Sequence, residues 1–377
     1  MIIAIPKEIL LGENRVSANP ASVKELIQAG LSVQIESGAG KGSHISDQNY
    51  EYTGATIVEN KAELLQNADI VLKVNHPIEN EADMLKDGSV FVSLFQTTKE
   101  TEAVQKLLLK KITGFSMHLV PRTTLAQKMD ALSSQSNITG YKAVLTGATH
   151  LGVYMPLLMT AAGTIPPAKV LILGAGVAGL QAIATAKRLG AQVEAFDVRP
   201  EVKEQVESLG AKFVEVSSDT DEGVGEGGYA KETTDEYKKQ QSELIKSHIA
   251  KSDMVITTAL IPGRQAPILI PKDMVEGMKP GSVIMDLAAE NGGNCELTKK
   301  DRVITVHDVI IDGAANIPST MPIHATQLYA KNITSFITYM IKDGKLNIDM
   351  EDEIISGAMF TYNGEITHEP TKEVLNR

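Results

Sequence analysis

The sequence predicts an α/β protein with two domains, each a doubly wound and mainly parallel β-sheet, and a cleft between them. Two observations support this fold class. Short apolar runs alternate with amphipathic segments along most of the chain, which is typical of strands and helices in α/β domains. The chain also has 377 residues, which is too long for one ordinary core and indicates two domains.

The N-terminal portion of the chain supplies the first domain. Five apolar runs are expected strands, and two amphipathic stretches are expected helices. Because strands and helices alternate, we expect a parallel sheet with helices on its faces. The expected strands are residues 2–5, 33–35, 70–74, 90–95 and 112–117, and the expected helices are residues 22–28 and 102–110.

The second domain follows a polar and partly helical segment, residues 121–141. A long amphipathic helix at residues 325–341 is expected to return to the first domain, which the C-terminal tail completes. We therefore assign residues 1–136 and 319–377 to the first domain and residues 137–318 to the second. The expected strands of the second domain are residues 170–173, 192–197, 254–259, 282–287 and 303–311.

A glycine-rich turn follows the first strand of the second domain. Gly174 permits a tight turn, Gly176 lets the backbone approach a pyrophosphate, and Gly179 lets the next helix lie against the sheet. The first turn of that helix, at Val177 and Ala178, offers unpaired N–H groups to phosphates. This pattern is typical of a dinucleotide-binding βαβ unit.

A carboxylate follows the next expected strand. Asp197 ends the apolar run 192–197, eighteen residues after Gly179. At this position a carboxylate accepts hydrogen bonds from ribose hydroxyls and repels a 2′-phosphate. The sequence therefore predicts a Rossmann-like domain that binds NAD(H) rather than NADP(H).

The composition restricts the class of protein. A net charge of −11 argues against nucleic acid or acidic membrane surfaces as partners. The single cysteine, Cys295, has no CxxC partner, and the eight histidines show no HxxxH or HExxH spacing, so we expect no disulfide and no metal site. No signal peptide is visible, and prolines interrupt the apolar stretch 155–180. We therefore expect a cytoplasmic protein.

Residues 216–235 break the alternation of strands and helices. They contain four glycines, many acidic residues and one aromatic residue, Tyr229. The segment is too long for a simple connection and too polar for a core. Composition alone leaves two interpretations open, a lid over a binding site or a solvated insertion.

The segment 121–137, PRTTLAQKMDALSSQSN, resembles the signature loop of the NAD(H)-binding component of proton-translocating nicotinamide nucleotide transhydrogenases. The resemblance extends over essentially the whole chain. It includes the glycine turn, GYAK at 228–231, TTALIPG at 257–263 and GGN at 292–294. It implies direct hydride transfer between NADH on this chain and NADP⁺ on a separate component, coupled to proton translocation. Both nicotinamides carry their own chemistry, so no general base is needed from the chain.

The resemblance also implies roles for individual residues. Arg122, Gln127, Asp130 and Ser133 would orient the nicotinamide and its ribose, with Gln127 facing the incoming NADP(H), and Tyr229 would be the tip of a mobile loop over NAD(H). Together with the glycine motif, the resemblance assigns the following residues to NAD(H) binding: Gly174, Gly176, Val177, Ala178, Gly179, Asp197, Val198, Arg199, Tyr229, Thr258, Ala259, Leu260, Gln135 and Asn137.

Partners follow from the same resemblance. The family places the proton channel in a membrane-spanning component and NADP(H) on another component, and its NAD(H)-binding component is a homodimer. The chain would then be peripheral, on the cytoplasmic face of the inner membrane, attached through these partners.

Two other functions remain open. The fold also resembles alanine dehydrogenase, whose substrate-binding cations are matched by Arg15 and Lys73. That enzyme needs a histidine acid/base where this chain has Gln96, which cannot transfer a proton at neutral pH. A non-catalytic NAD-sensing protein is the third hypothesis, and the intact loop at residues 122–141 argues against it.

Overall fold

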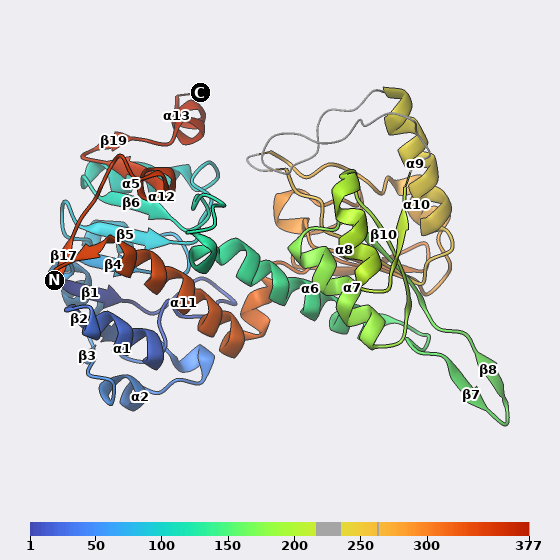
Figure 1. Cartoon of the computed structure of the whole chain (residues 1–377), viewed down its shortest axis with the longest axis horizontal. Helices are drawn as coiled ribbons and strands as arrows, with labels where there is room; N and C mark the ends of the chain where they lie inside the picture. Colours follow the sequence, from blue (N-terminus) through green and yellow to red (C-terminus); the bar gives the residue numbers. More distant parts are fainter. Residues whose placement is uncertain (216–234, 262–263, 377) are drawn as a thin grey trace. The chain divides into compact units, whose positions relative to one another are not determined.

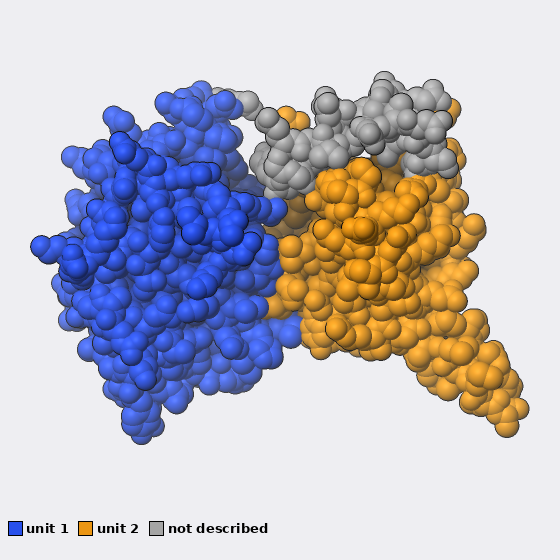
Figure 2. Space-filling view, viewed as in Figure 1, with its two compact units in different colours: residues 1–135, 318–377 blue, residues 136–317 orange. Residues whose placement is uncertain are grey.

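The computed structural model describes residues 1–215, 235–261 and 264–376 (Figure 1). The chain divides into two compact units, coloured separately in Figure 2. Unit 1 comprises residues 1–135 and 318–377, and unit 2 comprises residues 136–317. These bounds lie one residue from those expected from the sequence. Unit 2 is therefore an insertion between two segments of unit 1.

Unit 1 contains an eight-stranded sheet in the order β19-β18-β6-β5-β4-β1-β2-β3. The strands from β6 to β3 are parallel, whereas β18 and β19 extend the sheet in antiparallel pairing. The chain winds outward from β1 in both directions, so the sheet is doubly wound. The strands are β1 (Ile2–Ile5), β2 (Ser32–Glu36), β3 (Thr56–Val58), β4 (Ile70–Leu72), β5 (Val90–Ser93), β6 (Thr113–Ser116), β18 (Met359–Tyr362) and β19 (Glu365–Ile366).

Helices cover this sheet, and every residue of β4, β5 and β6 is buried, as expected for parallel strands with both faces covered. Helix α1 (Pro20–Gln28) begins with a capping box, in which Asn19 and Ser22 exchange hydrogen bonds of 2.9 Å between side chain and backbone. The other helices that lie wholly in unit 1 are α2 (Asp47–Glu51), α3 (Lys61–Asn67), α4 (Glu81–Met84), α5 (Thr101–Leu109), α11 (Pro322–Met340), α12 (Glu353–Ala358) and α13 (Glu369–Leu375).

Helix α11 is the expected long helix, and it packs in unit 1 as predicted. Its buried side chains Tyr329 and Phe336 belong to the same core cluster as β1 and α1. Full burial of such a side chain contributes roughly 1.5–3 kcal/mol. The Tyr329 hydroxyl also donates a hydrogen bond to the carbonyl of Lys73, which follows β4, at 2.7 Å. The C-terminal segment of the chain therefore completes the core of unit 1.

Unit 2 contains a seven-stranded sheet in the order β11-β10-β9-β12-β13-β15-β14. The pairs from β11 to β15 are parallel, and β10 and β12 flank β9, so the winding direction reverses at β9. The predicted α/β class with two doubly wound sheets is thus confirmed. The parallel strands are β9 (Lys169–Leu173), β10 (Gln192–Phe196), β11 (Lys212–Val214), β12 (Met254–Thr257), β13 (Val283–Asp286) and β15 (Val309–Asp312).

Helices also flank this second sheet. Helix α6 (Ala131–His150) starts in unit 1 and continues into unit 2. The helices that lie in unit 2 alone are α7 (Val177–Arg188), α8 (Lys203–Ser208), α9 (Asp235–Ile249) and α10 (Lys272–Glu276).

The prediction of one continuous strand at residues 303–311 is wrong. Residues 303–311 form most of a tight hairpin, in which β14 (Val303–Val306) pairs antiparallel with β15. The two residues between them, His307 and Asp308, have φ of 53° and 60°. Two consecutive left-handed residues form the kind of turn that reverses a hairpin. Neither residue is glycine, so the turn was not visible in the apolar run.

A second hairpin, which the sequence analysis did not anticipate, projects from unit 2 (Figure 1). Strands β7 (Leu158–Thr160) and β8 (Gly163–Ile165) pair with each other and with no other described strand. Apolar side chains on this hairpin face solvent, including Met159, which is 73% exposed. An isolated two-stranded hairpin is at best marginally stable in water. Among the described helices of both units, none has the length and apolarity needed to span a membrane.

Candidate functional site

The glycine turn lies between β9 and α7 in unit 2. Gly174 has φ of +102°, and its N–H donates to the carbonyl of Phe196 at 2.8 Å. A Cβ atom on Gly179 would lie 1.9 Å from the Gly174 carbonyl oxygen, so only glycine lets α7 pack this closely on the turn. Both glycines therefore have the backbone and packing roles that the motif predicts.

The N-terminus of α7 has room for an anion. Gly176 is the N-cap residue, and because glycine has no side chain it leaves the first turn of the helix without a side-chain cap. A Cβ atom added there would meet no described atom within 4 Å. The N–H groups of the first turn, which begins at Val177 and Ala178, lack helical partners and lie at the positive end of the helix dipole. This geometry suits a pyrophosphate.

Asp197 lies beside this turn, immediately after β10. Its Oδ2 atom accepts a hydrogen bond from the N–H of Ala175 at 2.7 Å. Its Oδ1 atom accepts one from the N–H of Arg199 at 2.9 Å. The Arg199 guanidinium closes an ion pair on the same carboxylate, with Nε–Oδ1 and Nη2–Oδ2 distances of 3.0 Å. Val198, between them, is half-buried against the core. The sequence analysis did not anticipate the ion pair.

The loop after β12 lies on the other side of the glycine turn. The N–H of Thr258 donates to the carbonyl of Leu173 at 2.8 Å, and its hydroxyl donates to the carbonyl of Gly174 at 3.0 Å. Ala259 follows, and the side chain of Leu260 is 47% exposed. Segments after β9, β10 and β12 thus meet at the carboxyl edge of the sheet where the winding reverses. Doubly wound sheets bind nucleotides at this position.

Two buried residues to which the sequence analysis gave no role hold this loop in place. The Asn294 side chain accepts a hydrogen bond from the Ala259 N–H at 3.0 Å and donates to the carbonyls of Ala259 and Pro267 at 2.9 and 2.8 Å. Asp286, at the end of β13, accepts the N–H of Asn294 at 3.1 Å. The two glycines before Asn294, with φ of +99° and +84°, are the sequence signal for this turn.

A separate cavity of about 280 Å³ lies in unit 1. The Asp130 carboxylate accepts hydrogen bonds from the N–H of Ser133 at 2.8 Å and from its hydroxyl at 2.6 Å. These contacts organise the first turn of α6. All four residues that the resemblance assigns to the nicotinamide border this one cavity, which is lined by Pro121, Arg122, Thr123, Thr124, Ala126, Gln127, Asp130 and Ser133.

Basic groups gather in unit 1 near Arg122. Burial lowers the pKa of His118, and the positive charges of Lys99, Arg122 and His368 lower it further. Burial also lowers the pKa of His368. His368 is hydrogen-bonded to Thr371 at 2.7 Å, so α13 contributes to this region. The positive charges of Lys99 and Arg122 make this region suited to an anionic ligand.

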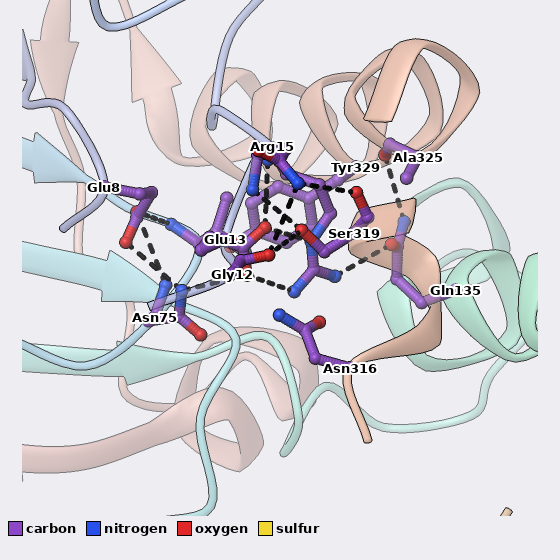
Figure 3. A network of polar contacts seen from close by, with 12 residues as sticks. Glu8, Gly12, Glu13, Arg15, Asn75, Gln135, Asn316, Ser319, Ala325 and Tyr329 are labelled. Atoms are coloured by element: carbon purple, nitrogen blue, oxygen red, sulfur yellow. Dashed lines mark hydrogen bonds and ion pairs between the residues drawn. The ribbon is translucent and has the colours of Figure 1, made fainter. Parts of the chain in front are cut away.

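Three further predicted residues have different positions. Gln135 is buried in unit 1, where it accepts from Arg15 Nη1 at 2.9 Å and donates to the carbonyl of Ala325 at 3.1 Å (Figure 3). In unit 2, the Asn137 side chain donates to Gln181 on α7 at 3.1 Å. Tyr229 lies outside the described residues.

The two cations that match alanine dehydrogenase are already paired with carboxylates. Arg15 forms hydrogen bonds of 2.8 and 2.7 Å to the two carboxylate oxygens of Glu13 (Figure 3). Lys73 is 1% exposed, and its Nζ atom lies 2.5 Å from Glu81 and 3.6 Å from Glu8. The ammonium group of Lys73 is therefore buried within the protein and neutralised by its own carboxylates.

Comparisons with known proteins agree with this geometry. The N-terminal domain model of the alanine dehydrogenase/PNT family matches residues 4–139, and the C-terminal domain model matches residues 143–369. The chain is 48% identical over 376 residues to an alpha-subunit polypeptide of the NAD(P) transhydrogenase of Rhodospirillum rubrum, covering 98% of each protein. It is 31% identical to alanine dehydrogenase of Staphylococcus saprophyticus, covering 100% of this chain and 97% of that protein.

Solved structures of a transhydrogenase and of an alanine dehydrogenase are also similar to this chain. The transhydrogenase from Sinorhizobium meliloti matches with a TM-score of 0.88 and 44% identity, over 97% of this chain and 100% of that one. An L-alanine dehydrogenase matches with a TM-score of 0.84 and 28% identity, over 100% and 99%. With both domain models matched, this chain belongs to the alanine dehydrogenase/PNT family.

Proposed function

We propose that this chain is the NAD(H)-binding component of a proton-translocating NAD(P) transhydrogenase. One observation carries the proposal. Arg122, Gln127, Asp130 and Ser133 border a single cavity, where a guanidinium, an amide, a carboxylate and a hydroxyl can orient a nicotinamide and its ribose through hydrogen bonds. A reaction between two nicotinamides needs orientation and exclusion of water rather than acid–base catalysis.

Unit 2 provides the residues that fit NAD(H). The first turn of α7 and the open space beside Gly176 suit the pyrophosphate, and Asp197 suits the adenosine ribose. Thr258, Ala259 and Leu260 form a further wall of this site, fixed by Asn294. When bound, NAD(H) supplies the hydride chemistry, and the protein binds and orients the cofactor.

The Arg122–Ser133 segment orients the nicotinamide and its ribose in this proposal. Asp130 and Ser133 hold each other through two hydrogen bonds, so their oxygens have a fixed geometry. Gln127 is exposed and presents an amide that both donates and accepts, which suits the nicotinamide ribose of NADP(H) on a partner component.

The remaining components lie on partners. A membrane-spanning component carries the proton channel, and another binds NADP(H), while this chain remains on the cytoplasmic face of the inner membrane. We also propose that two copies of the chain form a homodimer. The exposed apolar side chains of Met159 and Ile165 on the β7–β8 hairpin support this, because a second copy would cover them.

Alanine dehydrogenase activity is the second candidate, favoured by the similarity to that enzyme over the full chain. The residue after β5 that would transfer the proton is Gln96, whose side chain has no titratable proton near neutral pH. Lys73 forms ion pairs with Glu81 and Glu8 within the chain. We therefore place this activity second.

A reconstitution experiment tests the proposed function. Purified full-length chain is mixed with NADH and an NADP⁺ analogue of distinct absorbance, with and without an NADP(H)-binding component of a transhydrogenase. A parallel sample contains pyruvate and ammonium in place of the analogue. We expect reduction of the analogue only when the partner component is present.

The other outcomes contradict the proposal in different ways. Oxidation of NADH in the pyruvate sample would replace it with an alanine-type dehydrogenase. NADH binding without activity in either sample would favour a non-catalytic NAD-binding protein.

A further inference from the structure

Asp197 and Arg199 form a charged pair inside the candidate nucleotide site. The carboxylate receives two backbone N–H groups, from Ala175 at 2.7 Å and from Arg199 at 2.9 Å, so its position is fixed by the glycine turn and by its own loop. The Asp197 side chain is 6% exposed, whereas that of Arg199 is 23% exposed. The arginine therefore reaches solvent at the position where a ribose 2′ substituent is expected.

The two charges have opposite preferences for the adenosine ribose. A carboxylate at the end of this strand accepts hydrogen bonds from the 2′-hydroxyl, whereas a nearby arginine accommodates a 2′-phosphate. A phosphate monoester carries about −1.5 to −2 charges at neutral pH, so it is repelled by the first group and attracted by the second. Both groups are present here, and each guanidinium contact to Asp197 measures 3.0 Å.

We infer that Arg199 is a specificity-determining residue, which Asp197 prevents from binding the 2′-phosphate of NADP(H). The inference rests on the proposed function, because it assumes that NAD(H) binds at the glycine turn of unit 2. The arginine engages the carboxylate through two nitrogen atoms, in the planar geometry with which guanidinium groups also bind phosphate. Without the Asp197 carboxylate, the Arg199 guanidinium is available to bind the phosphate of a ligand.

This arrangement has a purpose in a transhydrogenase. The reaction needs different nucleotides on the two components, so NADP(H) must not occupy the NAD(H) site. Asp197 serves this need in two ways, since it repels the phosphate and also holds the cation that would attract it. A single substitution at Asp197 therefore removes the repulsion of the 2′-phosphate and releases Arg199 at the same time.

The test measures binding of NADH and NADPH to the full chain by titration of their fluorescence. Asp197→Ser removes the charge and leaves space for a phosphate. We expect NADPH to bind at least about tenfold more tightly to this variant than to the original chain, since two charge-assisted hydrogen bonds become available. NADH should bind more weakly, because the ribose hydroxyls lose their charged acceptor. Added salt should reduce the gain for NADPH.

Two further variants isolate the arginine. Asp197→Ser combined with Arg199→Ala should lose the gain for NADPH. Asp197→Asn, which keeps the side-chain volume, should give a smaller gain in the same direction. The melting temperature of each variant, followed by circular dichroism, confirms that it is folded.

Each outcome has a distinct meaning. An equal gain in the double variant would overturn the role of Arg199, and a folded Asp197→Ser variant with no gain for NADPH would overturn the inference as a whole. In both cases NADH binding to the original chain would leave the proposed function intact. No NADH binding by the original chain would instead refute the proposed function itself.

Discussion

The side chain of Asn294 forms two hydrogen bonds to the backbone of Ala259, accepting from its N–H at 3.0 Å and donating to its carbonyl at 2.9 Å. The amide side chain thus pairs with the N–H and the carbonyl of one residue, as the backbone of a neighbouring β-strand does. It fixes the loop after β12 beside the glycine turn, although the two residues are 35 positions apart in the chain. Asn294 thus positions the candidate nucleotide site without contributing to its exposed surface.

Replacement of Asn294 by alanine should weaken NADH binding. The change leaves polar backbone groups of Ala259 and Pro267 without their partners, at a cost of about 1–3 kcal/mol in the free energy of unfolding. The loosened loop should raise the Kd for NADH about tenfold. Titration of NADH fluorescence and urea unfolding measure the two effects. Ser252→Ala is the matched control, because it removes one buried hydrogen bond elsewhere in unit 2 and should leave the Kd unchanged.

Substitutions at two glycines of the turn should have different effects, one on NADH binding and the other on the free energy of unfolding. At Gly176 no described atom lies within 4 Å of an added Cβ, so Gly176→Val should fold normally but lose NADH binding through a clash with the pyrophosphate. At Gly179 an added Cβ meets a carbonyl oxygen at 1.9 Å. Gly179→Ala should therefore lower the free energy of unfolding by about 1–3 kcal/mol. Tight NADH binding by Gly176→Val would contradict the placement of the cofactor.

Gln127→Ala should affect transfer rather than binding. If Gln127 faces NADP(H) on the partner, its loss should leave the Kd for NADH within about twofold and slow hydride transfer by about a hundredfold, as expected when reacting groups are poorly aligned. Stopped-flow absorbance with the partner component measures the rate. Lys128→Ala, in the same turn, is the control and should transfer at the original rate. An unchanged rate in Gln127→Ala would contradict the role given to this residue.

The stability of unit 1 should depend on pH through Glu13. Burial alone would raise the pKa of the Glu13 carboxyl, but the hydrogen bonds and charge of Arg15 lower it to about 2 from an ordinary 4.5. A lowered pKa stabilises the folded state above pH 4.5, by about 3 kcal/mol, and this contribution is lost as the pH falls towards 2.

Glu13→Gln tests this dependence. It should destabilise the protein at pH 7, and the difference from the original chain should shrink steadily below pH 4.5. Urea unfolding at several pH values provides the measurement. Glu63→Gln, at an exposed position of α3, should show no such trend.

The β7–β8 hairpin should be needed for the homodimer. Met159→Asp and Ile165→Asp together place charges on side chains that are 73% and 41% exposed in the single chain, so folding should be unaffected. If a second copy covers these side chains, the charges should destabilise the dimer and yield a monomer. Analytical ultracentrifugation measures the mass.

Much of the fold could be predicted from sequence because its determinants are local. The apolar runs identify the strands, and Gly174 and Gly179 specify a turn whose geometry depends on residues a few positions away. The meeting of Asp197 with this turn also follows, since β9 and β10 are adjacent parallel strands with a fixed register. These features need no knowledge of distant side chains.

The features that could not be predicted depend on side chains brought together by the tertiary fold. Gln135 binds Arg15, which is 120 residues away, and nothing in its neighbourhood indicates this partner. The ion pair of Asp197 with Arg199 is close in sequence but depends on the side-chain conformation of the arginine. The turn at His307 and Asp308 contains no glycine, and although histidine and aspartate are enriched among the non-glycine residues with positive φ, neither residue signals this conformation by itself.

The insertion of unit 2 has a consequence for the synthesis of the chain. A ribosome makes the first six strands of unit 1, then the whole of unit 2, and only afterwards helix α11, which carries Tyr329 and Phe336 into the core of unit 1. The nucleotide-binding unit can therefore complete its folding first, since domains fold as units during translation. Residues 1–135 leave the ribosome before unit 2 but belong to the unit that is finished last, so their apolar strands must be protected while translation continues.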